Sequence, residues 1–150
     1  LNNGPARFTA IRNCHALMKG FFFGHKVQIF SYKIFEHYFL GINQSFQKNI
    51  LCIIDTNRRD LAIQKLSPKG KLIGKIKTYL IDNKLIELLS GDYVLMGNGI
   101  EKLKKIKDYS FIKKKLMGPI ELKSNYFINN VYQKKPQGKF PRIIYPYSPV

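Results

Sequence analysis

The chain has 150 residues, of which 45% are hydrophobic, and this is enough for the core of one domain or of two small ones. Its 26 Lys and Arg residues against 9 Asp and Glu residues give a formal net charge of +17, so the chain repels itself unless an anionic partner neutralises it. The usual partner of such a domain is nucleic acid, and an anionic membrane surface is the other candidate polyanion. No apolar run reaches the roughly 18–20 residues of a spanning helix, so we expect no membrane span.

The N-terminal part of the chain is basic throughout. No acidic residue precedes Glu36, whereas five basic residues do. The chain also begins with Leu1 instead of Met, which fits either a form processed by loss of an organellar targeting peptide or a simple truncation.

The sequence contains little that indicates catalysis or metal binding. Cys14 and Cys52 form no recognised redox or zinc motif, because structural zinc sites offer two closely spaced ligand pairs and here only His15 adjoins a cysteine. We interpret both cysteines as small buried hydrophobes. Since no P-loop, nucleophile elbow or aspartate–histidine pairing is recognisable, we expect no enzyme, no cofactor, no metal and no small-molecule substrate.

A first module over residues 1–64 is predicted to run helix, strand, helix, strand, strand. An amphipathic helix is predicted over 6–19, with an apolar stripe formed by Phe8, Ile11, Cys14, Leu17 and Met18. Alternation over 26–30 predicts a strand, and Ser31 is the expected N-cap of a helix that ends near residue 40. The apolar runs 49–54 and 61–66 predict two further strands.

A second α+β module is predicted over residues 65–127. It opens on the turn Ser67-Pro68-Lys69-Gly70, after which alternation over 71–81 predicts a strand with Lys71, Lys75 and Lys77 on one face. Asn83 is the expected cap of a short helix that Gly91 ends, and a strand over 93–96 leads into a glycine turn at 97–99.

The remaining segments are a lysine-rich insertion over 101–116, a strand candidate over 120–127, and a tail over 128–150 that is rich in Tyr, Pro and basic residues. The tail has no helical or strand period, so we expect it to need another surface to order it. The fold class predicted is therefore α+β, as two small modules with short mixed or antiparallel sheets and an irregular C-terminal extension.

The order of these features resembles the small-subunit ribosomal protein eight family, a universal family of two-domain ribosomal RNA-binding proteins. The shared landmarks are Ile11-Arg12-Asn13 in the first helix, a strand leading into Ser31, the turn at Ser67–Gly70 and the strand Val94–Met96 after a short helix and a glycine. Gly118-Pro119-Ile120-Glu121-Leu122 is similar to the glycine–glutamate strand that ends family members. The resemblance covers roughly residues 6 to 127.

The chain also departs from the family pattern. Met96, Gly97 and Asn98 replace the serine-rich loop with which the family contacts RNA, the lysine insertion is longer than usual, and the tail has no counterpart. Such drift is typical of organellar ribosomes. The resemblance therefore implies a non-enzymatic constituent of a mitochondrial small ribosomal subunit, or of one in a plastid-type organelle. Its implied partners are the central domain of the small-subunit rRNA and neighbouring ribosomal proteins.

Two alternatives to this function remain open. One is a basic protein-binding subunit of another organellar assembly, such as a respiratory or ATP-synthase complex, and the other is an unrelated accessory ribosomal protein.

The candidate RNA contacts lie in the two turns, the lysine insertion and the tail. They are Ser67, Lys69, Lys71, Asn98, Lys102, Lys104, Lys105, Lys107, Lys113, Lys114, Lys115, Lys134, Lys135 and Arg142. Lysines at such positions neutralise phosphates and add salt-dependent affinity. The structural alternatives are a solvated helix face for the insertion, ordinary turns at 67–71 and 97–99, and a tail that packs against proteins.

Overall fold

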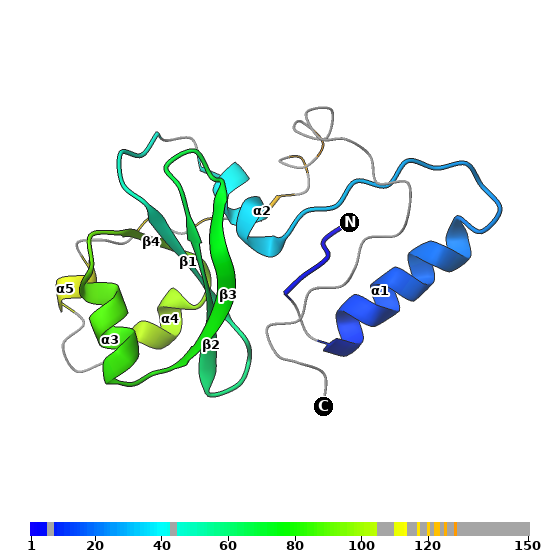
Figure 1. Cartoon of the computed structure of the whole chain (residues 1–150). Coiled ribbons are helices and arrows are strands. Elements are labelled where there is room, and N and C mark those ends of the chain that lie inside the picture. The colour runs from blue at the N-terminus through cyan, green and yellow to red at the C-terminus, as the bar shows by residue number, and fades with distance from the viewer. Residues whose placement is uncertain are drawn as a thin grey trace.

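A four-stranded sheet forms the centre of the fold in the computed structural model of the chain (Figure 1). The structure describes residues 1–5, 8–42, 45–104 and 110–113, together with residues 117, 120, 122, 123, 125 and 128. The elements in chain order are α1 (Phe8–Phe21), α2 (Ile34–Leu40), β1 (Ile50–Asp55), β2 (Asp60–Leu66), β3 (Leu72–Leu80), α3 (Asn83–Ser90), β4 (Val94–Met96), α4 (Ile100–Leu103) and α5 (Ser110–Lys113).

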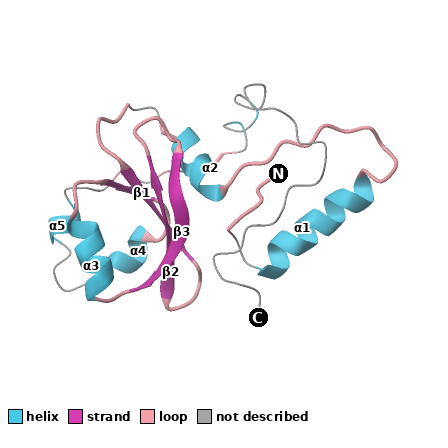
Figure 2. Ribbon diagram, in the orientation of Figure 1, coloured by secondary structure: helices cyan, strands magenta, loops and turns pink. Residues whose placement is uncertain are grey.

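The strands lie in the order β3-β2-β1-β4. Tight turns join β1 to β2 and β2 to β3, so both of these pairs are antiparallel, whereas β4 returns through α3 and lies parallel to β1. Helices α3, α4 and α5 cover one face of the sheet, and α2 lies against the other (Figure 2). This mixed sheet with helices confirms the predicted α+β class.

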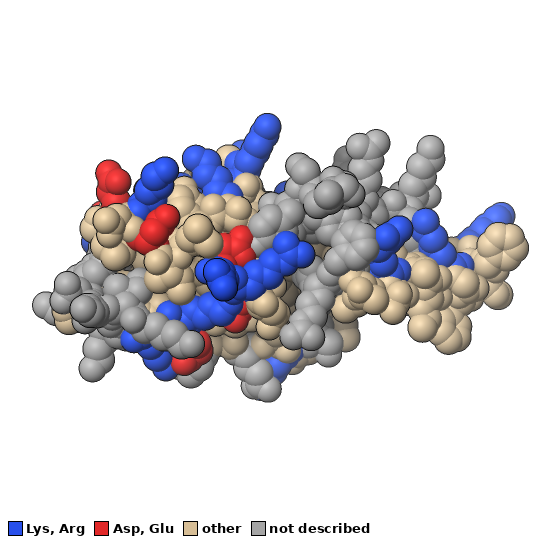
Figure 3. All heavy atoms as spheres, turned by 90° about the horizontal axis from the view of Figure 1, so that it is seen from below, with Lys and Arg blue, Asp and Glu red and all other residues tan. Residues whose placement is uncertain are grey.

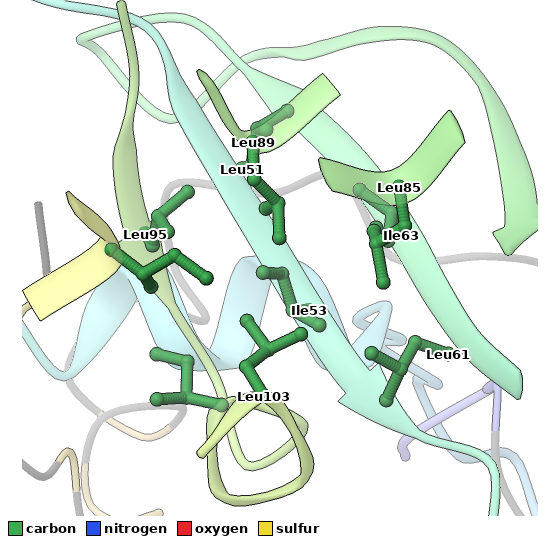
Figure 4. Close-up of a cluster of buried hydrophobic side chains, with 10 residues drawn as sticks. Leu51, Ile53, Leu61, Ile63, Leu85, Leu89, Leu95 and Leu103 are labelled. Carbon is green, nitrogen blue, oxygen red and sulfur yellow. The ribbon is translucent and has the colours of Figure 1, made fainter. Parts of the chain in front are cut away.

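The side chains of the central strand β1 alternate between two hydrophobic clusters, one on each face of the sheet. Leu51 and Ile53 pack with α3 and α4, and Figure 4 shows these side chains converging with those of β2 and β4. Ile50, Cys52 and Ile54 instead pack on the face that carries α2. Burial on both faces explains why β1 reads as a continuous apolar run.

The predicted boundary between residues 64 and 65 falls inside β2, which pairs with β1 on one side and β3 on the other. Strands from both predicted modules therefore share one sheet. The physical reason is that β2 has two hydrogen-bonding edges, and its partners come from opposite sides of the predicted boundary.

Two helix starts differ from the sequence prediction. Helix α2 begins at Ile34, so Lys33 takes the N-cap position predicted for Ser31, and the carboxylate of Glu36 accepts a hydrogen bond from the Lys33 amide at 2.7 Å. Helix α3 is capped by Asp82, whose Oδ1 accepts from the Leu85 amide at 3.1 Å, and Asn83 is the first helical residue. A carboxylate at this position also suits the helix dipole.

Two predicted strands are absent among the described residues. Residues 26–30 form no strand, because this segment lies apart from the sheet and the Phe30 carbonyl accepts from the Leu1 amino group at 2.7 Å. In the stretch 120–127, Asn125 is helical and the other described residues are irregular. Within the described parts of the chain, no helix is both long and apolar enough to cross a bilayer.

The cysteine prediction is confirmed for Cys52 and wrong for Cys14. Cys52 is fully buried, and this burial raises the pKa of its thiol well above the usual value. Cys14 is exposed, because α1 buries the stripe that contains Ile11 and His15. Burial is also the main factor that lowers the pKa of His15, with Lys19 contributing.

Candidate nucleic-acid interface

The β2–β3 hairpin carries five lysines and no acidic residue between Asp60 and Asp82. The five are Lys65, Lys69, Lys71, Lys75 and Lys77. All except the half-buried Lys65 are exposed. None of the ion pairs found among the described residues involves them. We call these five residues the hairpin lysines.

The turn at the end of the hairpin is held by hydrogen bonds within itself. The Ser67 amide donates to the Lys71 carbonyl at 2.8 Å, and the Lys71 amide donates to the Ser67 hydroxyl at 3.1 Å. Gly70 has a φ of 77° and lies so close to the Phe39 ring of α2 that a Cβ would collide with it. Ser67 therefore has a structural role, while Lys69 and Lys71 extend from a fixed turn.

A bulge in β3 changes which residues of β2 lie opposite the lysines of β3. Ile63 pairs with Lys77 and Lys65 with Ile73, so Gln64 alone faces the residues between Ile73 and Lys77. The buried Gln64 amide donates to the carbonyls of Ile73 at 2.8 Å and Lys65 at 3.0 Å, so the carbonyls at the bulge stay paired. Because directly paired residues point to the same face, Lys65 and Lys77 lie on the same face as Ile63.

Lys65 is oriented on this face by an aromatic ring. Its ammonium lies 5.1 Å from the ring centre of Tyr93, a distance typical of a cation–π contact. Tyr93 itself packs against the cluster around α3. The contact holds the Lys65 ammonium over the Tyr93 ring.

The glycine turn at 97–99 connects β4 to α4, and its polar groups bind β1. Asn98 Oδ1 accepts from the Asp55 amide at 3.0 Å, and the Gly99 amide donates to the Ile53 carbonyl at 2.9 Å. These groups hold the fold, which favours the structural alternative at this turn over a phosphate cradle.

Two of the predicted lysines have carboxylate partners. Lys102 Nζ lies 2.5 Å from Asp55 Oδ1 and donates to the Arg58 carbonyl at 2.6 Å, and its side chain is 24% exposed. Lys104 forms an exposed ion pair with Glu101 at 2.7 Å. Both charges are thus offset within the chain and contribute less to a positive surface.

Of the other predicted RNA contacts, the structure describes one in part and the rest not at all. Lys113 belongs to α5, and only its backbone is described. Residues outside the described ranges are Lys105, Lys107, Lys114, Lys115, Lys134, Lys135 and Arg142.

Lys65, Lys75 and Lys77 were not among the predicted contacts, although the alternation placed the last two on an exposed strand face. The signal that identifies them is the lack of any carboxylate over residues 61–81. Figure 3 shows basic side chains over both the sheet and α1, whereas the acidic side chains visible in that view lie over the sheet.

No metal site accompanies these lysines in the part of the chain that the structure describes, where no three His, Cys, Asp or Glu side chains gather into a candidate metal site. The site and fold together define an α+β protein with a basic β-hairpin.

No protein-family model and no curated protein sequence matches the chain. A solved structure from Pseudomonas aeruginosa, described as an uncharacterized protein with similarity to peptidase YEAZ, matches with a TM-score of 0.66 and 10% sequence identity. The match covers 97% of this chain and 71% of that chain. At this identity the likeness shows a shared fold.

Proposed function

We propose that the protein binds folded RNA through the hairpin lysines, as a non-enzymatic constituent of a ribonucleoprotein. The observation that carries this proposal is the concentration of these cations on one hairpin in which residues 61–81 contain no carboxylate. A net charge of +17 adds a long-range attraction for polyanions. The particular target implied by the family resemblance is the central domain of the small-subunit rRNA in an organellar, mitochondrial ribosome.

The proposed mechanism is electrostatic docking. Each ammonium that contacts a phosphate releases condensed counterions, so affinity falls steeply as salt rises. If all of the hairpin lysines contacted phosphates, the slope of log K against log salt would lie between about −3.5 and −4.5. The fixed turn and the bulge reduce the conformational entropy lost on binding, because they position the backbone beneath these side chains.

The test is filter binding of a central-domain rRNA fragment over a salt series. In the double variant Lys75→Ala/Lys77→Ala we expect a loss of affinity of about tenfold at low salt and a slope shallower by about 2. The charge-matched control Lys26→Ala/Lys84→Ala removes two exposed lysines outside the hairpin and should bind nearly as the unmodified chain does. An equal loss in both double variants would contradict the hairpin interface, and a flat salt response would exclude electrostatic RNA binding.

Competition with transfer RNA tests the particular target. We expect a large excess of transfer RNA to displace little of the rRNA fragment. Complete displacement at equal concentration would leave RNA binding in place and refute the ribosomal target.

A further inference from the structure

The β2–β3 hairpin offers little aromatic surface. Tyr79 is the one aromatic residue between Asp60 and Asp82, and it is half-buried and packs against the hydrophobic cluster around α3. Unpaired RNA bases are commonly bound by stacking on exposed aromatic side chains. Over residues 60–82, all of which the structure describes, the hairpin therefore has lysines for phosphates but no exposed ring for bases.

Two further rings lie beside the hairpin, and contacts within the chain engage both. Tyr93 is half-buried, the Lys65 ammonium lies 5.1 Å from its ring centre, and a Cβ at Gly91 would lie only 2.6 Å from one of its ring carbons. The Phe39 ring lies so close to Gly70 that a Cβ would collide with it, and it packs against the cluster on the α2 face of the sheet. A base that stacked on either ring would have to compete with these contacts.

The exposed aromatic rings in the described part of the chain lie elsewhere. They are Phe21, Phe22 and Phe23, at and just beyond the end of α1, and this helix stands apart from the sheet in Figure 1. An unpaired strand on the hairpin would therefore be held there by its phosphates alone.

We propose that the hairpin lysines contact double-helical segments of RNA and discriminate against unpaired strands. An unpaired strand loses conformational freedom when it is held in place, and base stacking is what usually offsets this loss. A double helix is already ordered and is recognised through its shape, its phosphates and its 2′-hydroxyls. Each phosphate neutralised on a double helix also releases more counterions than one on a single strand. This inference names the kind of RNA for the function proposed above and rests on that function.

The exposed polar side chains of the hairpin suit phosphates and not base edges. Those exposed between residues 61 and 81 are Lys69, Lys71, Lys75 and Lys77. The hydrogen-bonded turn and the Gln64 amide at the bulge hold the backbone that carries them, so a fixed set of cations meets a fixed set of phosphates with little loss of freedom. The major groove of an RNA double helix is too narrow for side chains to read its bases. We therefore expect binding that does not depend on the sequence of the duplex.

The experiment uses the intact chain and two RNA probes, a blunt-ended duplex of about 20 base pairs and one of its strands alone, chosen so that it does not pair with itself. By fluorescence anisotropy at low salt, Lys75→Ala/Lys77→Ala should weaken binding of the duplex about tenfold, and the slope of log K against log salt should become shallower by about 2. The affinity for the single strand should change by less than about twofold, because the hairpin contributes little to binding of that probe.

A second variant and a control complete the set. Lys69→Ala/Lys71→Ala should show the same selective loss, since it removes exposed side chains from the turn and leaves the hydrogen bonds between residues 67 and 71 in place. Lys26→Ala/Lys84→Ala, outside the hairpin, should alter neither affinity appreciably. Circular dichroism verifies that all three variants fold.

The possible failures are distinguishable. A loss of equal size on the duplex and the strand, or a larger loss on the strand, would overturn the preference for double helices and leave RNA binding through the hairpin in place. A large difference in affinity between two duplexes of different sequence would overturn contact through phosphates alone. No loss on either probe would refute the hairpin interface itself, and this inference with it.

Discussion

Gly97 brings the turn after β4 against the backbone of β1. It has a φ of 108°, a value that residues with a side chain rarely adopt, and a Cβ at this position would collide with the Ile53 carbonyl. Gly99 is nearly as restricted, because its Cβ would meet the Ile53 side chain at 2.8 Å. Both glycines are therefore required by the fold.

Substitution of Gly97 by Ala should lower the free energy of unfolding by about 2–3 kcal/mol, because the backbone of β1 would have to move. Urea denaturation measures this change. Gly20→Ala is the matched control, since a Cβ there meets nothing within 4 Å, and it should stabilise α1 by about 0.5–1 kcal/mol. Similar stability of both variants would contradict the close approach at Gly97.

For single residues, the sequence shows which side-chain groups are present but not whether the fold buries them or pairs them with other groups. Cys14 and Cys52 are the same residue type in apolar stretches, and only tertiary packing decides that one is exposed and the other buried. Asn98 illustrates the same limit, because the amide suited to RNA is engaged with Asp55 on β1, a residue distant in sequence.

The bulge in β3 depends on one buried side chain from β2. Gln64 is 2% exposed, and its amide nitrogen donates to carbonyls on both strands. A carbonyl that is buried without a hydrogen-bond donor costs free energy, so the bulge is stable only with the Gln64 amide as donor. The bulge in turn determines that Lys77, and not Lys75, lies opposite Ile63.

Replacement of Gln64 by Leu keeps the volume and removes the donor. We expect a loss of about 1–3 kcal/mol in the free energy of unfolding and faster amide hydrogen exchange along β3. Thr78→Val is the control, because it removes a polar group from the same strand outside the bulge and should cost less. If Gln64→Leu is as stable as the unmodified chain, the bulge does not need its donor.

Most elements could be predicted from local patterns, and their pairing could not. Periodicity placed α1, α2, α3 and all four strands within a few residues of their observed bounds, since amphipathic patterns depend on neighbouring residues. The described residues of the lysine-rich insertion include most of α4 and all of α5. Strand partners depend on contacts between distant residues, which is why the predicted boundary at 64/65 divides a continuous sheet.

Charge acts on the molecule as a whole. With +17 spread over 150 residues, repulsion among the cations opposes the compact state. Ion pairs such as Lys102–Asp55 offset only part of it, because the chain has 9 acidic residues for 26 basic ones. The basic character of the surface follows from composition alone, whereas the position of the hairpin lysines required the fold.

Added salt should therefore stabilise the free protein. We expect Tm to rise by about 3 °C or more between 20 and 300 mM NaCl, because the screening length at about 0.1 M is only about 10 Å. Differential scanning calorimetry measures the shift. The variant Lys75→Glu/Lys77→Glu, with a lower net charge, should show a smaller increase. A fall in Tm with salt would mean that attractive pairs outweigh the repulsion.

The position of β4 beside β1 has a consequence for the nascent chain. Strands β1, β2 and β3 follow one another through short turns and can pair once Leu80 has emerged, whereas β4 arrives only after the crossover through α3. Until then one edge of β1, a strand with five apolar residues in six, has unpaired amides and carbonyls. That edge is the surface on which a half-synthesised chain is most prone to aggregate and most dependent on a chaperone.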